Sequence, residues 1–335
     1  SICHRRIFLA TVILLGLWDA APAQWKNLAP NLVRAHQYYG AMHYKDGIIW
    51  AGSEDLWSSK DTGKTWTRVS SFFIPGDVIR DIAFSDRNIG VICTNGGGIY
   101  ITRNGGATWN MSWPTPYCWR IAIHRSSNTM YAAVGKDTLN VLTSFDEGVT
   151  WVPQTISGRV QTMSIGVDGS VFVLSYEGTA AKVSASTNRG ATWSQANGPV
   201  DFDSYSLEVD SCDNRQFYII NEDYASSNNG LSEIYSSTDA GATWRVSFSQ
   251  PVNYLAGSAA SSKNVQYVPT LSNGVLRSTD RGRSWKNIGG PGNVADSRNI
   301  CAINDNTIFV LDPFGSIWAT FNSGADSLPA FPSTG

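Results

Sequence analysis

The sequence is poor in the residues that most often build metal and redox centres. It has five cysteines and four histidines in 335 residues, and it contains no Cys-x-x-Cys pair. The histidines His36, His43 and His124 lie in different repeats, so they do not have the spacing of a zinc site. The 25 basic and 27 acidic residues nearly balance, which leaves no electrostatic footprint for nucleic acid. We therefore expect no metal, no cofactor and no nucleic-acid partner.

The sequence also lacks an apolar run long enough to span a membrane. Its longest N-terminal apolar stretch, Ile7 to Trp18, has twelve residues, whereas a spanning helix needs about 20. This stretch follows His4-Arg5-Arg6 and precedes Ala21-Pro22-Ala23. That order predicts a signal peptide over residues 1–23 with cleavage after Ala23. We expect a secreted or periplasmic protein with no membrane insertion after cleavage.

Several common catalytic signatures are missing. There is no Gly-x-Ser-x-Gly sequence for a serine hydrolase. Gly63-Lys64-Thr65 resembles the end of a phosphate-binding loop, but Ser58 stands where that motif needs its first glycine. Gly96-Gly97-Gly98 has neither the spacing nor the following helix of a dinucleotide site. These absences remove the commonest nucleotide-dependent and serine-dependent activities.

The chain does contain one short sequence motif that occurs seven times. The first copy is Ser59-Lys60-Asp61-Thr62-Gly63-Lys64-Thr65-Trp66. The copies are centred on Asp61, Asn104, Asp146, Asn188, Asp239, Asp280 and Asn322, and the last lacks the tryptophan. Subtracting successive positions gives intervals of 43, 42, 42, 51, 41 and 42 residues. A period of this length predicts a propeller or solenoid built from one supersecondary unit.

The motif has the composition of a β-hairpin turn. An Asp or Asn side chain accepts hydrogen bonds from backbone N–H groups ahead of it, and the glycine two residues later takes the left-handed conformation. Strand-like runs such as Gly98 to Ile101 and Gly274 to Leu276 precede the copies. In this motif the chain closely resembles the Asp-box (BNR repeat) family over nearly its whole mature length. That family includes sialidases, xyloglucanases, sortilin-type receptors and photosystem assembly factors.

A second strand pair lies between consecutive boxes, which makes four strands per period. We therefore predict an all-β, seven-bladed propeller of four-stranded antiparallel blades. The mature N-terminus, Gln24-Trp25-Lys26-Asn27-Leu28, matches the strand after the sixth box, Ser284-Trp285-Lys286-Asn287-Ile288. The seventh box has no such strand after it, so we expect Trp25 to Ala29 to close the ring. The propeller is predicted as one domain over residues 24–326, followed by a flexible tail over residues 327–335.

Four cysteines remain after the predicted cleavage, namely Cys93, Cys118, Cys212 and Cys301. Export permits disulfides, and the sequence leaves their pairing open. Cys93 and Cys301 lie inside apolar strand-like runs. For these two we predict small buried thiols.

Candidate binding residues come from the loops that lead into the innermost strands, because these loops gather around the channel on the face opposite the boxes. The selected ligand-binding residues are Arg80, Asp81, Trp119, Arg120, Tyr254 and Arg298. Aromatic faces beside carboxylates and arginines suit a glycan or a peptide of a protein partner. A long loop, residues 222–230, falls within the one stretched interval and is a further place for binding contacts.

The resemblance implies two functions. The size and blade number are similar to those of photosystem assembly factors, which implies a monomeric, non-catalytic binding or scaffolding module. The alternative is a glycoside hydrolase, sialidase-like or xyloglucanase-like, with Asp81 as the candidate catalytic carboxylate. Sialidases have six blades and an Arg-Ile-Pro signature before the first box, whereas this chain has Phe73-Ile74-Pro75 after it. The sequence therefore favours the binding module.

Overall fold

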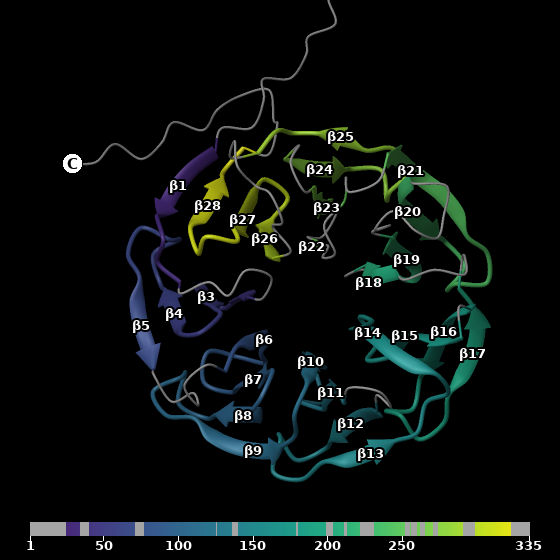
Figure 1. The fold of residues 1–335 in the computed structure, drawn as a ribbon, viewed down its shortest axis with the longest axis horizontal. Coiled ribbons are helices and arrows are strands. Elements are labelled where there is room, and N and C mark those ends of the chain that lie inside the picture. The colour runs from purple at the N-terminus through teal and green to yellow at the C-terminus, as the bar shows by residue number, and fades with distance from the viewer. Residues whose placement is uncertain are drawn as a thin grey trace, which may run out of the picture.

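The computed structural model describes residues 25–33, 40–70, 77–124, 126–135, 140–178, 180–198, 204–210, 213–221, 231–251, 255, 260–261, 265–270, 274–290 and 299–322. These residues form seven four-stranded antiparallel sheets, which are arranged as blades around a central axis (Figure 1). The predicted seven-bladed, all-β propeller is confirmed.

Each blade takes its four strands in chain order, except the last. Blade 1 contains β2 (Ala41–Lys45), β3 (Ile48–Gly52), β4 (Leu56–Ser59) and β5 (Thr67–Ser70). Blade 2 contains β6 (Ile79–Phe84), β7 (Gly90–Thr94), β8 (Gly98–Thr102) and β9 (Asn110–Pro114). Blade 3 contains β10 (Cys118–Ile123), β11 (Met130–Val134), β12 (Asn140–Ser144) and β13 (Val152–Gln154). Blade 4 contains β14 (Arg159–Ile165), β15 (Val171–Glu177), β16 (Ala180–Ser186) and β17 (Ser194–Asn197).

The remaining blades follow the same plan. Blade 5 contains β18 (Ser204–Asp210), β19 (Asp213–Asn221), β20 (Leu231–Ser237) and β21 (Arg245–Pro251). Blade 6 contains β22 (Ala260–Ser261), β23 (Gln266–Pro269), β24 (Val275–Ser278) and β25 (Lys286–Asn287). Blade 7 contains β26 (Asn299–Asn304), β27 (Thr307–Leu311), β28 (Ile317–Thr320) and, as its outermost strand, β1 (Trp25–Ala29).

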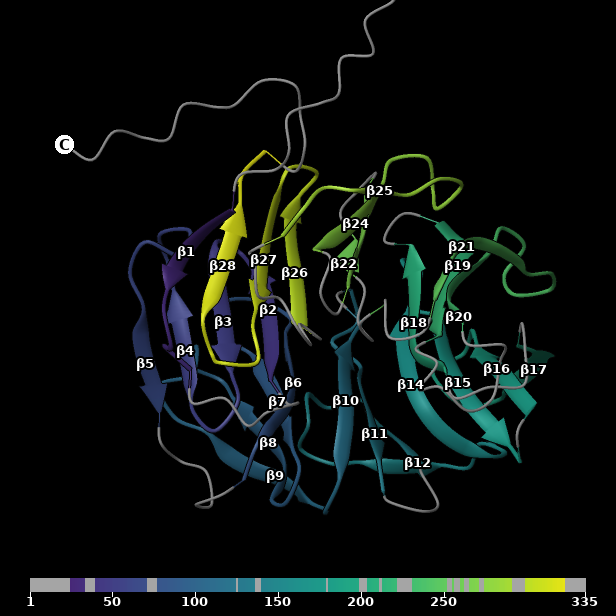
Figure 2. The ribbon, with the colours of Figure 1, turned by 45° about the horizontal axis from the view of Figure 1, so that its top comes forward.

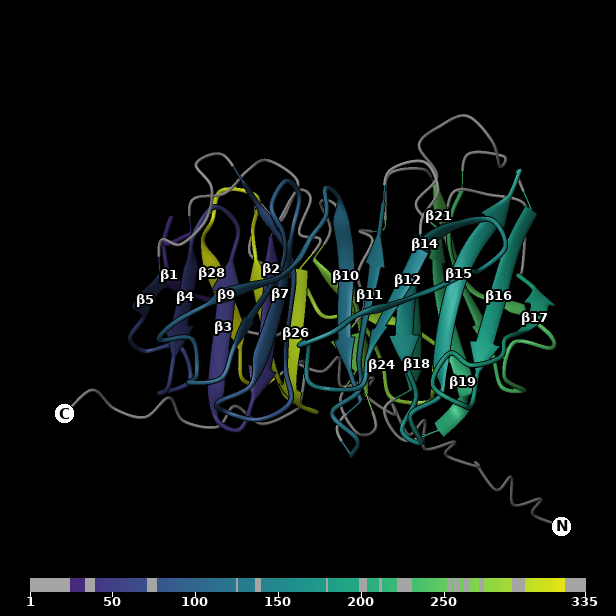
Figure 3. The same ribbon diagram turned by 90° about the horizontal axis from the view of Figure 1, so that it is seen from below.

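The order of strands within a blade fixes which loops share a face of the ring. The first strand of each blade lies nearest the axis and the fourth lies at the rim, as β6, β10 and β14 and then β9, β13 and β17 show in Figure 1. Neighbouring strands are antiparallel and cross the thickness of the disc (Figure 3). Loops leading into the first strands therefore lie on one face, which we call the loop face. The Asp-box turns, which join the third and fourth strands of blades 1 to 6, lie on the other face, which we call the box face.

The ring is closed by its N-terminal strand, as the sequence predicts. β1 pairs antiparallel with β28, with Trp25 opposite Thr320 and Ala29 opposite Ile317, and the two strands lie side by side (Figure 2). Just beyond β1, the N–H of Val33 donates to the carbonyl of Gly315 at 3.1 Å. The two ends of the propeller are thus held together by main-chain hydrogen bonds, and β1 covers the edge that β28 would otherwise expose.

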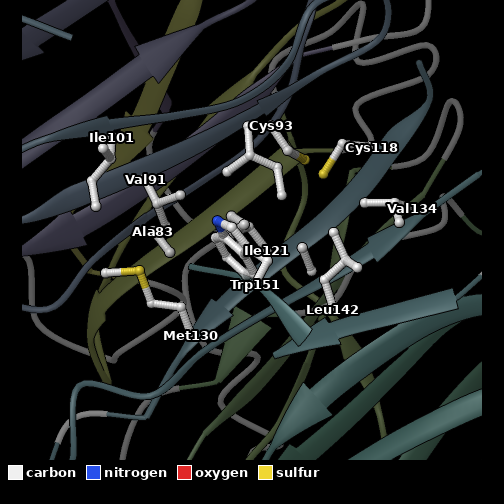
Figure 4. Packing of buried hydrophobic residues seen from close by; sticks show 12 residues of the cluster. Ala83, Val91, Cys93, Ile101, Cys118, Ile121, Met130, Val134, Leu142 and Trp151 are labelled. Atoms are coloured by element: carbon white, nitrogen blue, oxygen red, sulfur yellow. The ribbon is translucent and has the colours of Figure 1, made fainter. Parts of the chain in front are cut away.

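The hydrophobic core lies between the blades. Buried residues of the described chain form seven clusters, and each cluster joins two neighbouring blades. Figure 4 shows the cluster between blades 2 and 3, where Val91 and Ile101 of one blade face Ile121 and Leu142 of the next. Full burial of such a side chain contributes about 1.5–3 kcal/mol. Because each blade shares its core with both neighbours, the blades depend on one another for stability.

Three cysteines of the described residues, Cys93, Cys118 and Cys301, are buried free thiols. The predictions for Cys93 and Cys301 are therefore confirmed, and Cys212 lies outside the described residues. Cys93 and Cys118 point toward one another across the junction of blades 2 and 3 (Figure 4). Burial raises the pKa of Cys301 to about 12, so this thiol stays protonated at neutral pH.

The Asp-boxes are hydrogen-bonded turns of the predicted kind. In the first box, Asp61 Oδ1 accepts the Thr65 N–H at 2.9 Å, and Asp61 Oδ2 accepts the Thr65 hydroxyl at 2.6 Å. The Ser59 hydroxyl donates to Asp61 at 2.8 Å and accepts the Gly63 N–H at 2.8 Å. In the seventh box the structure describes only the start, where the Thr320 hydroxyl donates to Asn322 at 2.9 Å.

Candidate functional site

A channel runs along the axis of the ring. It has a volume of about 500 Å³ and is lined by the innermost strands β2, β6, β10, β14, β18 and β26. Most lining side chains are apolar or small, and the charged and polar ones among the described residues are His43, Asp81, Arg120, His124, Ser126, Ser164, Glu208 and Asn299. The loop-face end of this channel contains two of the residues selected from the sequence, Asp81 and Arg120.

Asp81, the candidate catalytic residue, links two blades. Its Oδ1 accepts the N–H of Ile82 at 2.9 Å, and its Oδ2 accepts the N–H of Ile121 in the next blade at 3.0 Å. Arg120 lies 3.9 Å from Oδ2 through its Nη1. Both carboxylate oxygens are therefore engaged by backbone donors.

The same kind of link recurs elsewhere around the channel. His43 of blade 1 accepts the N–H of Phe84 in blade 2 at 3.2 Å through Nε2. Ser164 of blade 4 accepts the N–H of Val209 in blade 5 at 3.1 Å. In each case a polar side chain on the innermost strand of one blade accepts a backbone N–H of the innermost strand of the next blade. Asp81 makes the same structural contact.

The protonation of Asp81 is shifted toward the neutral form. Burial raises its pKa, and the Arg120 charge and the N–H groups of Ile121 and Ile82 oppose that rise. The side chain keeps 17 % of its surface exposed, so its desolvation is incomplete. A raised pKa suits a general acid, but the backbone hydrogen bonds fix both oxygens in a role between the blades.

Beside the channel mouth, Arg80, Trp119 and Tyr117 form a stack on the loop face. Arg80 Cζ lies 4.4 Å from the centroid of the Trp119 ring, which is a cation–π contact. The Tyr117 and Trp119 ring centroids are 6.3 Å apart with planes 15° from parallel. Trp119 Nε1 donates to the carbonyl of Gly135 at 2.8 Å. The stack therefore combines an arginine of blade 2 with aromatic residues at the start of blade 3.

Asn95 holds this stack in place, and the sequence analysis did not select it. Arg80 donates to Asn95 Oδ1 from Nη2 at 2.6 Å and from Nε at 3.2 Å. The carbonyl of Asn95 accepts the N–H of Tyr117 at 2.8 Å. The sequence signal that could have identified Asn95 is the Gly96-Gly97-Gly98 run after it, because this run marks a tight loop between β7 and β8 on the loop face.

That loop is anchored by a buried carboxylate. Asp77 accepts the N–H groups of Val78, Gly96 and Gly97 at 2.7 to 2.9 Å. Tyr117, which follows in the next blade, has a φ of 59°, a conformation rare for a bulky residue. Its carbonyl accepts the Gly135 N–H at 2.8 Å, so the strained residue is fixed on both sides. This sort of strain concentrates at functional sites.

Four of the six candidate residues therefore meet at one junction. Arg80, Asp81, Trp119 and Arg120 lie together between blades 2 and 3. Tyr254 and Arg298, and the loop over residues 222–230, lie outside the described residues. Among the residues that the structure describes, no group of three or more histidine, cysteine or acidic side chains has a metal-binding arrangement. Over the same residues, no helix has the length and apolarity to cross a membrane.

Seven four-stranded blades with Asp-box turns after their third strands, closed into a ring by the N-terminal strand, define a seven-bladed Asp-box propeller. The family model described as photosynthesis system II assembly factor YCF48 matches residues 23–260. The chain belongs to this family. The search of curated proteins found no match.

Two solved structures of YCF48 proteins have the same fold. The chain is similar to YCF48 bound to a D1 peptide, with a TM-score of 0.65 and 17 % identity over 90 % of this chain and 99 % of that one. It is also similar to YCF48 from Cyanidioschyzon merolae, with a TM-score of 0.63 and 12 % identity over 89 % and 98 %. At these identities the likeness shows the fold.

Proposed function

We propose that this protein is a non-catalytic propeller that binds a peptide segment of a partner protein at the channel mouth of blades 2 and 3. The observation that carries the proposal is the stack of Arg80, Trp119 and Tyr117 beside Arg120. Family membership supports it, as does the solved YCF48 relative that contains a D1 peptide.

The site offers the groups that a peptide needs. Trp119 and Tyr117 present flat, half-buried aromatic surface that is already ordered, so little side-chain entropy is lost on binding. Arg120 is 32 % exposed, and its contact with Asp81 is long at 3.9 Å. Its guanidinium is therefore free to donate to a peptide carbonyl or carboxylate. The aromatic faces would also stack on a sugar ring, so glycans form the comparison arm of the test.

The engagement of Asp81 favours binding over hydrolysis. A glycoside hydrolase of the inverting kind needs two carboxylates about 6.5–9.5 Å apart with a water or sugar between them. Asp81 accepts two backbone hydrogen bonds and faces Arg120, which suits a structural acceptor. The hydrolase remains the second function that the experiment below distinguishes.

We further infer that the chain is exported, with residues 1–23 as the signal peptide and residues 24–326 as one monomeric domain. The basic, apolar and small-residue order before Gln24 supports this proposal. N-terminal sequencing of the protein recovered from the exported fraction tests it, and a retained Ala23 at an unprocessed N-terminus would contradict it.

The binding proposal predicts a specific loss of affinity. Trp119→Ala removes the central ring of the stack, so the dissociation constant should rise about tenfold or more, ~1.4 kcal/mol. Asp81→Asn should change it modestly. The assay is calorimetric titration of the mature protein with the D1 peptide, a panel of unrelated peptides and a glycan array.

Arg103→Ala is the matched control, because Arg103 also spans blades 2 and 3 but lies on the box face, where it pairs with Glu147 at 3.0 Å. The Arg103→Ala variant should bind the peptide with the affinity of the wild type. Unchanged affinity in Trp119→Ala would remove the channel mouth from consideration. Turnover of a chromogenic glycoside that Asp81→Asn abolishes would establish the hydrolase instead.

A further inference from the structure

A second cavity lies on the box face, between blades 1 and 2. Its volume is about 580 Å³, within the range of about 300–1,000 Å³ that is typical of ligand sites. It is lined by the turn between β2 and β3, the first Asp-box, β5, the turn between β6 and β7, and the second Asp-box. We call it the box-face groove. It is separate from the channel mouth, which opens on the opposite face.

The box-face groove is rich in positive charge. Lys60, Arg68 and Arg87 line it, and Asp46 is the only acidic side chain among its described lining residues. Lys60 and Arg87 are exposed and make no ion pair with any residue that the structure describes. Asp46 instead lies 3.8 Å from Lys45, and Arg68 lies 3.6 Å from Asp55. Two cations at this groove are therefore uncompensated.

The junction of blades 2 and 3 contains an ion pair that the described residues at the junction of blades 1 and 2 lack. Between blades 2 and 3, Arg103 donates to the Glu147 carboxylate at 3.0 Å and to its carbonyl at 2.8 Å. Arg103 precedes the box residue Asn104, and Glu147 follows the box residue Asp146. In the box-face groove Lys60 stands in the place of Arg103, and Gly105 stands in the place of Glu147.

Because Gly105 has no side chain, the ion pair corresponding to Arg103–Glu147 cannot form at Lys60. The other boxes have a side chain at this position, and at the junction of blades 5 and 6 it again crosses to the neighbouring blade, where Arg281 lies 3.4 Å from Asp213. Between blades 1 and 2 no acidic side chain can cross from Gly105 to Lys60. The carboxylate that Arg103 contacts at the junction of blades 2 and 3 therefore has no counterpart beside Lys60 in the described part of the chain.

The inner wall of the groove contains a buried indole. Trp50 also lines the groove and is fully buried, stacked on Phe84 with ring centroids 3.7 Å apart. Its Nε1–H has no hydrogen-bond acceptor among the residues that the structure describes. The indole N–H groups of Trp25, Trp57 and Trp193 are buried in the same way, so this donor does not by itself point to a ligand.

We propose that the box-face groove binds an acidic peptide segment of a protein partner. Its cations come from three separate elements, the first Asp-box, β5 and the turn between β6 and β7. An extended chain with several carboxylates matches this distribution better than a single compact anion does. The carboxylates take the place that Glu147 fills one blade further on. This site is independent of the channel-mouth proposal, because different residues on the opposite face form it.

The test uses a short fluorescent peptide of alternating Glu and Gly, with its Gln-for-Glu analogue as the uncharged control. Fluorescence anisotropy should show binding of the acidic peptide alone, weakening as salt rises from about 50 to about 500 mM. The double variant Lys60→Ala/Arg87→Ala should weaken binding about tenfold or more. Both residues are exposed, so folding should be retained, and the melting temperature checks this.

The matched control is Arg283→Ala/Lys286→Ala, which removes one exposed arginine and one exposed lysine at the sixth box. It should bind like the wild type, and so should Trp119→Ala on the loop face. Equal loss in both double variants would reduce the effect to net charge and overturn the proposal. Unchanged affinity in Lys60→Ala/Arg87→Ala would overturn it as well. Displacement of the peptide by an equal concentration of inorganic phosphate would reassign the groove to small anions.

Discussion

At the scale of single residues, the boxes contain more backbone strain than their glycines suggest. The box glycines Gly63 and Gly106 have φ values of 82° and 93°, as their motif requires. In the first six boxes the residue before the glycine is also left-handed, and in the first box it is Thr62, with a φ of 61°. A β-branched residue is rarely found in this conformation. The second box has Gly105 at the same position.

Thr62→Gly should therefore stabilise the protein. Relief of the strain outweighs the greater freedom of glycine in the unfolded chain, and we expect the free energy of unfolding to rise by about 1 kcal/mol. Urea denaturation measures it. Ala240→Gly is the control, because Ala240 has a φ of 60° without a β-branch, so its gain should be smaller. A lower unfolding free energy in Thr62→Gly would show that the turn relies on the threonine side chain.

At the scale of elements, the Asp-box is a turn whose carboxylate is held ionised by its own donors. In the boxes of Asp61, Asp146 and Asp239, hydrogen bonds from Thr65, Thr150 and Thr243 lower the aspartate pKa to about 2. For Asp280, burial opposes the shift, but hydrogen bonds led by Ser284 still lower the pKa to about 2. The boxes of Asn104 and Asn188 keep the same turn without a charge, since their Nδ2 groups donate to Thr108 and Thr192 at 2.9 and 2.8 Å.

Because of these aspartates, we expect the free energy of unfolding to fall at acidic pH. A carboxylate whose pKa is depressed in the folded state contributes stability above its unfolded pKa, about 3.9, and loses it as pH falls toward 2. A variant with all four aspartates replaced by asparagine should fold, because three natural boxes contain asparagine. Its urea midpoint should fall less than that of the wild type between pH 4 and pH 2. If the urea midpoints of the variant and the wild type fell equally between pH 4 and pH 2, the box aspartates would contribute nothing to acid denaturation.

At the scale of the whole molecule, stability depends on closure. β1 supplies the outermost strand of blade 7, and Ala29 and Trp25 join the clusters on either side of that blade. Without β1 the edge of β28 would be exposed and two inter-blade clusters would lose contacts. An open sheet edge also invites pairing with another chain.

Deletion of residues 24–29 should lower the melting temperature by on the order of 10 °C and promote aggregation. Differential scanning calorimetry and size-exclusion chromatography measure the two effects. Lys26→Ala, which changes an exposed side chain on the same strand, should leave both unchanged. A monomeric deletion variant with the wild-type melting temperature would contradict the closure model.

The sequence alone determined the repeat, the blade number, the box turns and the closing strand. Each of these follows from local chemistry, since the hydrogen bonds of Asp61 and the left-handed φ of Gly63 fall within a few residues of each other. The match between Trp25-Lys26-Asn27 and Trp285-Lys286-Asn287 likewise repeats one strand. The sequence also placed Arg80, Asp81, Trp119 and Arg120 at one face, because loops that lead into innermost strands must meet there.

Only the tertiary structure decided what those residues do. The link from Asp81 to the N–H of Ile121, the support of Arg80 by Asn95 and the unpaired Lys60 opposite Gly105 all join segments that are 15 to 45 residues apart. Such contacts depend on how neighbouring blades pack and on the register of their strands, and a period in the sequence does not specify either. The repeat therefore fixes where side chains emerge, and the packing between blades fixes which of them meet.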